Sequence, residues 1–169
     1  IQTSLVGSEM CIRDSDKGTK LLLEKHTSGM SGNVLDFACG AGVIASYLML
    51  TYPHLKMQLS DISALAIYAS AMTLAANGQS ATLHAANGLY GIEGKVQHIV
   101  TNPPFHTGLK TDYTITKRFI EDARKMLSQN GTLQMVANRF LPYPGLLSEH
   151  FPRVLTTAQT TQFSLYQAA

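Results

Sequence analysis

The sequence predicts an α/β protein with a seven-stranded, mostly parallel sheet, helices on both faces and one antiparallel edge strand. Three observations support this fold class. Short runs rich in apolar and β-branched residues alternate with longer runs of helical periodicity. A glycine-rich turn at residues 38–42 joins the first such run to a helical one. Two β-like runs end the chain, which indicates a hairpin at one edge of the sheet.

Seven strands and four helices are expected in order along the chain. The expected strands cover residues 33–37, 56–60, 81–85, 96–101, 133–137, 153–158 and 163–167. The expected helices cover residues 41–52, 63–77, 114–127 and 146–150. Pro53 ends the first helix, and Ser63 caps the second. Asn77 with Gly78 closes the second helix, and a turn at residues 129–131 closes the third.

The composition is that of a single globular domain. The chain has 169 residues, of which 45% are hydrophobic and 14% charged, which is enough to bury a core. Its net charge of +2 excludes a strongly basic nucleic-acid coat but allows a local basic patch. The apolar runs are too short for a transmembrane helix. Two cysteines make no disulfide framework, so we expect a cytoplasmic protein.

Residues 1–15 lack the pattern of the rest of the chain. The stretch 5–15 shows neither helical nor strand periodicity and resembles a translated sequencing-adapter fragment. We therefore interpret residues 1–15 as a non-native or disordered tail. The domain is expected to span residues 16–169.

The turn after the first expected strand has the composition of a ligand-binding loop. Residues 36–42 read Asp-Phe-Ala-Cys-Gly-Ala-Gly, and ligands of open α/β sheets bind at the carboxyl ends of the strands. Gly40 and Gly42 permit a tight turn and a close approach of the backbone to a ligand. Asp61 ends the second strand, where its carboxylate can accept both hydroxyl hydrogens of a ribose. The dinucleotide pattern GxGxxG lacks its third glycine here, which disfavours an oxidoreductase.

The sequence Asn-Pro-Pro-Phe at residues 102–105 directly follows the fourth expected strand. Prolines stiffen the backbone and lack N–H donors, which leaves the Asn102 side-chain oxygen and the Pro103 carbonyl as acceptors. Two acceptors can hold the planar amino group of a nucleobase, and stacking on Phe105 would contribute about 1–3 kcal/mol. Such positioning can lower the barrier to methyl transfer by roughly 7–11 kcal/mol. The catalytic candidates are therefore Asn102, Pro103, Pro104 and Phe105.

These motifs resemble those of class I methyltransferases, which have a Rossmann-like sheet. The DxxxGxG form of residues 36–42 is similar to their motif I. Residues 102–105 are similar to motif IV of amino methyltransferases that act on adenine N6, guanine N2 or glutamine amides. With His106, and with Val-Ala-Asn-Arg-Phe-Leu-Pro-Tyr at residues 136–143, the chain resembles the ribosomal RNA small subunit methyltransferase C family. The resemblance runs from about residue 16 to residue 167 and implies that the family's N-terminal domain is missing.

The resemblance implies an activity, a cofactor and its binding residues. It implies methyl transfer from S-adenosylmethionine to N2 of a guanine in 16S ribosomal RNA, at guanine 1207. The cofactor-binding residues that it implies are Asp36, Cys39, Gly40, Gly42, Asp61, Ile62 and Asn87. Two positions depart from the family pattern. Ala38 stands where the family has the first glycine of motif I, and Asn87 stands where a contact to the adenine amino group is often placed.

Basic residues gather in the second half of the chain. The RNA-binding candidates are His106, Lys110, Lys117, Arg118 and Arg139. On the third expected helix, Lys117 and Arg118 each lie seven positions before a second basic residue, Arg124 and Lys125 respectively. The two resulting basic stripes favour contact with RNA phosphates. A solvated helix face explains the same pattern. The expected partner is the small ribosomal subunit, the expected state is a monomer, and the scattered histidines predict no metal site.

Three other functions are compatible with the same motifs. Large-subunit ribosomal RNA would be methylated by the same chemistry. Adenine N6 or a protein glutamine amide would be accepted by the same motif IV, although those enzymes more often carry Tyr at the position of Phe105. A non-catalytic RNA-binding module with a decayed cofactor site would account for Ala38 and Asn87.

Overall fold

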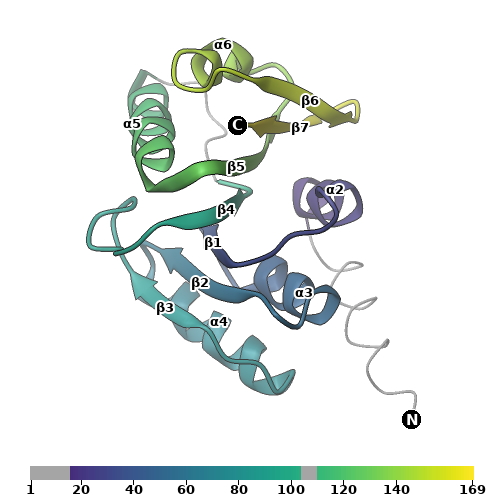
Figure 1. Ribbon diagram of the computed structural model, residues 1–169, viewed down its shortest axis with the longest axis vertical. Coiled ribbons are helices and arrows are strands. Elements are labelled where there is room, and N and C mark those ends of the chain that lie inside the picture. Colours follow the sequence, from purple (N-terminus) through teal and green to yellow (C-terminus); the bar gives the residue numbers. More distant parts are fainter. Residues whose placement is uncertain (1–15, 104–109) are drawn as a thin grey trace.

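The structure, a computed structural model, describes residues 16–103 and 110–169 (Figure 1). Its elements are α2 (Lys17–Lys25), β1 (Asn33–Phe37), α3 (Val43–Thr51), β2 (Lys56–Asp61), α4 (Ala64–Ala76), β3 (Thr82–Ala85), β4 (Val96–Thr101), α5 (Lys110–Met126), β5 (Leu127–Asn138), α6 (Tyr143–Ser148), β6 (Val154–Gln159) and β7 (Phe163–Ala168). All seven expected strands are present, six of them with bounds within one residue of those expected. The predicted α/β fold class is confirmed.

The seven strands form one sheet in the order β3-β2-β1-β4-β5-β7-β6. Neighbouring strands from β3 through β5 are parallel. The predicted antiparallel strand is β7, which pairs antiparallel with both β5 and β6. The short connection between β6 and β7 permits only an antiparallel hairpin. The antiparallel strand therefore lies one place in from the edge, and β6 forms the edge.

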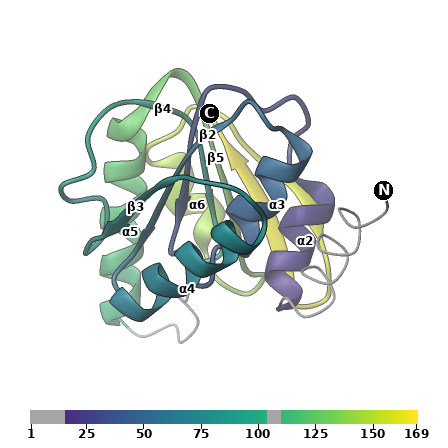
Figure 2. The ribbon, with the colours of Figure 1, turned by 90° about the horizontal axis from the view of Figure 1, so that it is seen from below.

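Helices cover both faces of the sheet, as predicted (Figure 2). Alternate residues of each strand face opposite sides: Val34 of β1 packs in a cluster with α2, α3 and α4, whereas Leu35 packs in a cluster with α5 and α6. Both side chains are fully buried. Burial of such a side chain contributes about 1.5–3 kcal/mol, so the two clusters hold the carboxyl ends of the central strands in fixed positions.

Helix α2 was not expected from the sequence. Asp16 caps it by accepting the backbone N–H groups of Gly18 and Thr19. Its consecutive residues Leu21 and Leu22 are both buried, because the helix lies between α3 and the strands β5 and β7. The helix has a polar and an apolar face, but its apolar residues form one run of three in a segment of nine. Such a short run does not distinguish a helix from a strand, so this helix was not predicted.

The turn expected at residues 129–131 is an irregularity inside β5. Val96 pairs with Leu127 while His98 pairs with Thr132, so the register shifts between them. A Cβ on Gly131 would lie 3.1 Å from the Gln97 carbonyl oxygen, so the strands approach closely at this glycine. Strand β5 therefore begins directly after α5.

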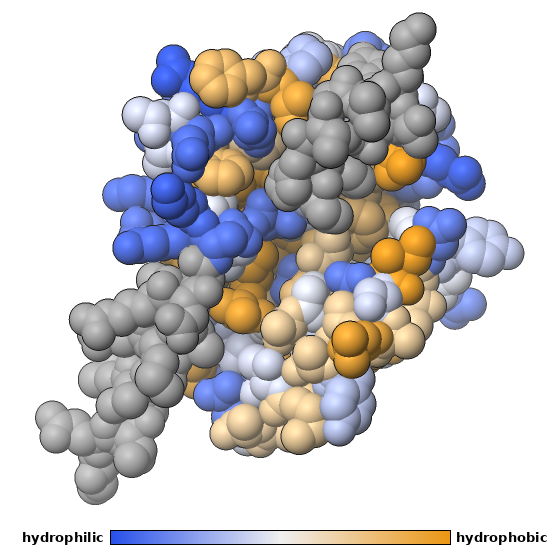
Figure 3. All heavy atoms as spheres, turned by 180° about the vertical axis from the view of Figure 1, so that it is seen from behind, coloured by the Kyte–Doolittle hydropathy of each residue, from blue (hydrophilic) through white to orange (hydrophobic). Residues whose placement is uncertain are grey.

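The two ends of the molecule differ in surface character. In Figure 3 apolar side chains gather over the lower part of the view, where Figure 1 places α4.

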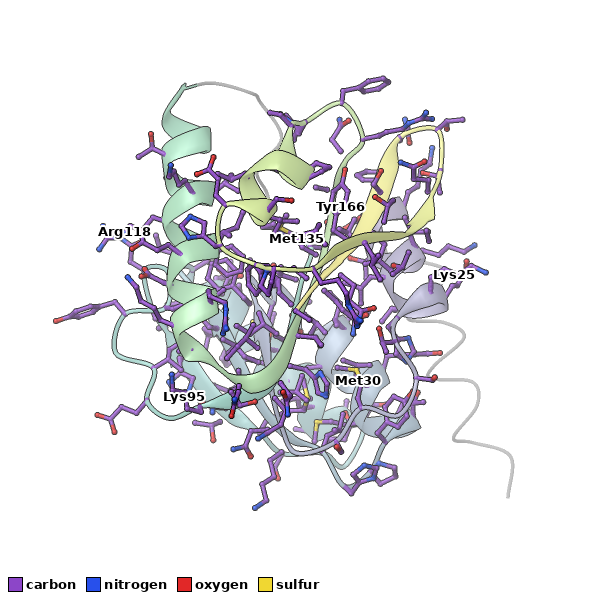
Figure 4. The ribbon with its side chains drawn as sticks, turned by 45° about the horizontal axis from the view of Figure 1, so that its top comes forward. Lys25, Met30, Lys95, Arg118, Met135 and Tyr166 are labelled. Atoms are coloured by element: carbon purple, nitrogen blue, oxygen red, sulfur yellow. The ribbon has the colours of Figure 1, made fainter. Side chains whose placement is uncertain are left out.

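Met135 and Tyr166, on neighbouring strands β5 and β7, pack in the core (Figure 4). No helix in the described ranges is both long and apolar enough to cross a membrane.

Candidate active site

A cleft of about 1360 Å³ opens at the carboxyl ends of the parallel strands. Ala38 follows β1, Asp61 ends β2, Asn87 follows β3 and Asn102 follows β4, and all four line it. Helix α5 closes one side with residues that include Phe119. The volume exceeds the roughly 300–1,000 Å³ of a typical small-molecule site, so the cleft has room for a cofactor and a second ring.

The glycine turn is held by backbone hydrogen bonds. The N–H of Cys39 donates to the carbonyl of Ser60 at 3.0 Å, and the N–H of Gly42 donates to the carbonyl of Cys39 at 2.8 Å. Gly42 has a φ of 75°, and a Cβ there would lie 3.0 Å from the Ser70 hydroxyl. Gly42 therefore serves packing behind the turn, and it does not line the cleft.

Ala38 adopts a left-handed backbone conformation. Its φ of 55° makes it the one described residue other than glycine with a positive φ. The left-handed region costs an L-residue roughly 1–2 kcal/mol. This is the position where the resemblance predicted a glycine, and its backbone has the conformation that a glycine would adopt freely.

Asp61 joins the two turns at the cleft. One carboxylate oxygen accepts the N–H of Gly40 at 3.0 Å, and the other accepts the N–H of Ser63 at 2.9 Å. Each oxygen keeps a second lone pair, so the carboxylate is fixed in orientation and can still accept hydroxyl groups. Beside it, Ile62 is 73% exposed and lines the cleft, where its apolar surface can contact a flat ring.

Asp36 lies beneath the glycine turn and not on the cleft wall. It is fully buried, one carboxyl oxygen accepts the N–H of Ala45 at 3.1 Å, and the other has no partner among the described residues. Burial, opposed by the Ala45 hydrogen bond and reinforced by Asp61, raises the pKa of Asp36 to about 8. Asp36 therefore anchors the start of α3 and holds a proton over much of the neutral range.

Cys39 lines the cleft with a protonated thiol. Its sulfur lies 3.3 Å from the Ser70 hydroxyl. Burial, with a further contribution from the Asp36 carboxylate, raises the pKa of Cys39 to about 12. The thiolate is the nucleophilic form of cysteine, so this side chain contributes shape and no covalent chemistry.

The loop after β3 forms the wall opposite the glycine turn. Its backbone is tied to β2, because the N–H of Ala86 donates to the carbonyl of Asp61 at 3.0 Å. Asn87, one of the predicted cofactor-binding residues, lines the cleft. The next residues also line it, and sequence reasoning missed them because they carry no motif: Gly88, Leu89, Tyr90, Gly91 and Ile92.

Asn102 is held by helix α2. Its side-chain nitrogen donates to both carboxylate oxygens of Asp16, at 3.1 and 3.0 Å, and to the Thr19 hydroxyl at 3.0 Å. Asp16 and Thr19 line the cleft, although neither was among the predicted site residues. Pro103, the next residue in the chain, is buried and is not among the residues that line the cleft. The remaining predicted residues of this region lie outside the described residues: Pro104, Phe105, His106 and the side chain of Lys110.

The predicted basic stripes are largely paired with acids. Lys117 lies 2.9 Å from Glu149, and Lys125 lies 2.8 Å from Glu121. Arg118 has a looser contact with Asp122 at 3.9 Å, its side chain is 83% exposed, and it projects from α5 (Figure 4). Exposed ion pairs exchange partners at little cost, so these cations remain available to an anionic partner.

Two further predictions concern residues outside the helix. Arg139 is exposed just after β5. No group of three metal-ligating side chains occurs among the described residues.

The sequence and the fold match known methyltransferases. The model of the methyltransferase small domain matches residues 9–167. The chain is 72% identical to the ribosomal RNA small subunit methyltransferase C of Alteromonas mediterranea, over 92% of this chain and 43% of that protein. It is 45% identical to the protein of the same name from Pseudoalteromonas atlantica, over 89% of this chain and 44% of that protein.

A solved structure shares the fold over nearly the whole chain. The 16S rRNA N2 G1207 methyltransferase of T. thermophilus, in complex with AdoMet and guanosine, superposes with a TM-score of 0.78 at 26% identity. The match covers 92% of this chain and 43% of that one. The chain spans less than half the length of these relatives. The resemblance predicted from the motifs is confirmed, and the chain belongs to the methyltransferase small domain family.

Proposed function

We propose that this chain is the catalytic domain of an enzyme that methylates N2 of a guanine in 16S ribosomal RNA, with S-adenosylmethionine as the donor. The observation that carries the proposal is the Asn102 side chain, whose nitrogen is engaged by Asp16 and Thr19 on the wall of a cleft that Asp61 also lines. The relatives of 72% and 45% identity carry the name of this activity. Guanine 1207 is the proposed target, as in the T. thermophilus enzyme.

The residues of the cleft fit S-adenosylmethionine. The Asp61 carboxylate is oriented by two backbone N–H groups and can accept the ribose hydroxyls. Ile62 offers an apolar surface for the adenine ring. A Cβ on Gly40 would meet no atom within 4 Å, so the cofactor's methionine portion can approach this backbone closely. Cys39 and Asn87 complete the proposed contacts, and Asp36 and Gly42 support them from behind.

The reaction needs positioning more than proton removal. The bound cofactor supplies an activated methyl group on its sulfonium. The guanine N2 lone pair forms the new N–C bond as the C–S bond breaks toward sulfur, and one amino proton then leaves to water. Asn102 and Pro103 would accept the amino hydrogens and direct the nitrogen at the methyl carbon. Burial raises the pKa of Cys39 to about 12, which disfavours attack by its thiolate.

RNA binding is proposed for the basic surface beside the cleft. Arg118 lines the cleft and is largely exposed, and Arg139 is exposed at the carboxyl end of β5. We assign phosphate contacts to these two with Lys117, Lys110 and His106. The guanine must be unstacked to reach the cleft. The small ribosomal subunit is the proposed partner of a monomeric, cytoplasmic enzyme whose domain spans residues 16–169.

The test uses labelled S-adenosylmethionine with unmodified small and large ribosomal subunits in separate reactions. Digestion of the RNA to nucleosides identifies the product. N2-methylguanosine from the small subunit alone is expected, and primer extension then locates the modified nucleotide. N2-methylguanosine from the large subunit alone would assign the same reaction to large-subunit ribosomal RNA instead. N6-methyladenosine or labelled protein would assign a different acceptor, and RNA binding with neither cofactor binding nor transfer would support an RNA-binding module with a decayed cofactor site.

A further inference from the structure

The amide of Asn102 has an unusually complete set of acceptors around its nitrogen. Both carboxylate oxygens of Asp16 and the hydroxyl of Thr19 lie within 3.1 Å of it. An amide nitrogen has two hydrogens to donate. Because three acceptors surround two hydrogens, both hydrogens of the Asn102 nitrogen have a partner in every arrangement.

The donor and acceptor roles in this network admit one arrangement. The Thr19 hydroxyl donates its only hydrogen to the second Asp16 carboxylate oxygen, at 3.2 Å. The hydroxyl can therefore offer only a lone pair to Asn102, and the carboxylate is likewise an acceptor. An inverted amide would place the Asn102 oxygen against lone pairs. The network thus fixes the nitrogen toward α2, and in the described part of the chain no protein donor occupies the oxygen.

The backbone of α2 is shaped for this contact. Asp16 is the N-cap, and its first carboxylate oxygen also accepts the N–H groups of Gly18 and Thr19. A Cβ on Gly18 would lie 3.1 Å from both the oxygen and the nitrogen of the Asn102 amide. Glycine at this position therefore permits the close approach of the helix to Asn102. The N-cap then holds the Asp16 carboxylate within hydrogen-bonding distance of the Asn102 nitrogen.

We propose that Asp16 is a positioning residue that fixes the Asn102 amide, with Thr19, so that its oxygen is free to accept the amino group of the target base. This proposal rests on the proposed function, because it assigns the acceptor for guanine N2. A carboxylate hydrogen-bonded to the amide nitrogen also increases the negative charge on the amide oxygen. That oxygen then holds more strongly an amino group whose hydrogens become more positive as the new N–C bond forms.

The test separates this role from helix capping. In Asp16→Ser the side chain remains a good N-cap but is too short to reach Asn102, and Thr19→Val removes the second acceptor. Asp16→Asn keeps an oxygen in place and loses the charge. We expect kcat for subunit methylation to fall about 10–100-fold in Asp16→Ser and less in Asp16→Asn, with the thermal midpoint and cofactor affinity unchanged. A kcat within twofold of the original chain in Asp16→Ser, or an equal loss of cofactor affinity, would overturn the proposal.

A binding measurement decides the proposal without turnover. Guanosine and inosine differ only in the N2 amino group, and their affinities can be measured by NMR titration with S-adenosylhomocysteine bound. We expect the original chain to favour guanosine about tenfold and Asp16→Ser to lose this preference. The proposal fails if Asp16→Ser keeps the preference or if the original chain shows none. A guanosine preference that depends on Asp16, without methylation of small subunits, would support the positioning role and refute the proposed function.

Discussion

The two walls of the cleft are built in different ways. The first wall, residues 38–42 with Asp61, is held mainly by backbone groups: the carboxylate of Asp61 accepts two N–H groups, and the turn closes on itself. The second wall, Asn102 with Asp16 and Thr19, is held by side chains 86 and 83 positions apart in the sequence. The first wall thus joins groups 21 positions apart, and the second joins groups about four times farther apart in the sequence.

This difference assigns different duties to the two walls. The backbone hydrogen bonds that close the glycine turn do not depend on any side chain, which suits the binding of a cofactor used in every turnover. A wall made of side chains has its geometry set atom by atom, which suits the orientation of one reacting group. We expect substitutions in the first wall to change cofactor affinity and substitutions in the second to change the rate of transfer.

The largest expected effect is that of Asn102→Ala. Loss of the acceptor should lower kcat about 100–1,000-fold, comparable to removal of one group that stabilises a transition state in other enzymes. Affinity for S-adenosylhomocysteine, measured by calorimetry, should change less than twofold. Equal losses of rate and affinity, or a lower thermal midpoint, would show that Asn102 supports the fold and would erase the distinction between the walls.

Asp61→Ala should give the opposite pattern. The substitution removes a charged acceptor of the ribose hydroxyls, and hydrogen bonds to charged groups contribute about 1.5–3 kcal/mol. Cofactor affinity should therefore fall about 10–100-fold, while kcat at saturating cofactor stays within a few fold. Asp61→Asn keeps one acceptor oxygen without the charge, but its amide nitrogen takes the place of an oxygen that accepts a backbone N–H, so we expect a loss of affinity there too. An unchanged affinity in the alanine variant would remove Asp61 from the binding site.

Most of the fold could be predicted from the sequence because its signals are local. Strand β1 has the predicted bounds, and Ser63 caps α4 as predicted, accepting the N–H of Ala66. Helix α2 could not be predicted, because its apolar residues form a single run of three in a nine-residue segment, and such a run fits a strand equally well. The start of β5 was hidden for a related reason, since the glycine that marks a turn in a sequence also marks an irregular strand pairing.

The candidate site was predicted only in part. Of the predicted cofactor residues, Cys39, Gly40, Asp61, Ile62 and Asn87 line the cleft, whereas Asp36 and Gly42 lie behind it. A motif gives spacing along the chain, but which side of a turn faces the ligand depends on packing against residues such as Ser70. Asp16 and Thr19 were missed because their role arises only when α2 meets the end of β4.

The buried Asp36 should make stability depend on pH. Its pKa is about 8 in the folded protein against an ordinary value of 3.8, so the folded state binds this proton more strongly than the unfolded chain. The contribution of Asp36 is therefore greatest below about pH 4 and is lost as the pH rises toward 8, at up to about 1.4 kcal/mol per pH unit.

Urea unfolding of the original chain and of Asp36→Asn at several pH values isolates this contribution. The amide keeps an acceptor for the Ala45 N–H and cannot ionise. We expect the difference in unfolding free energy between the two proteins to shift in favour of the asparagine variant as the pH is raised from 4 to 8. A difference that is constant over this range would mean that Asp36 does not titrate there, and that no buried ionisable group supports the first wall from behind.

The smallest expected effect concerns strain in the first wall, and it has a matched control in the same turn. Ala38 and Gly40 have nearly the same φ, 55° and 54°, but only Ala38 carries a Cβ. Ala38→Gly should raise the unfolding free energy by about 0.5–1 kcal/mol, because relief of left-handed strain exceeds the entropy cost of glycine.

Gly40→Ala should lower the unfolding free energy by about 1 kcal/mol through strain alone, since a Cβ there meets no atom within 4 Å. Such changes shift the thermal midpoint by about 2–4 °C in a protein of this size. If Ala38→Gly is instead destabilising, the packing of the Ala38 methyl against the core cluster outweighs the strain, and the first wall depends on a side chain after all.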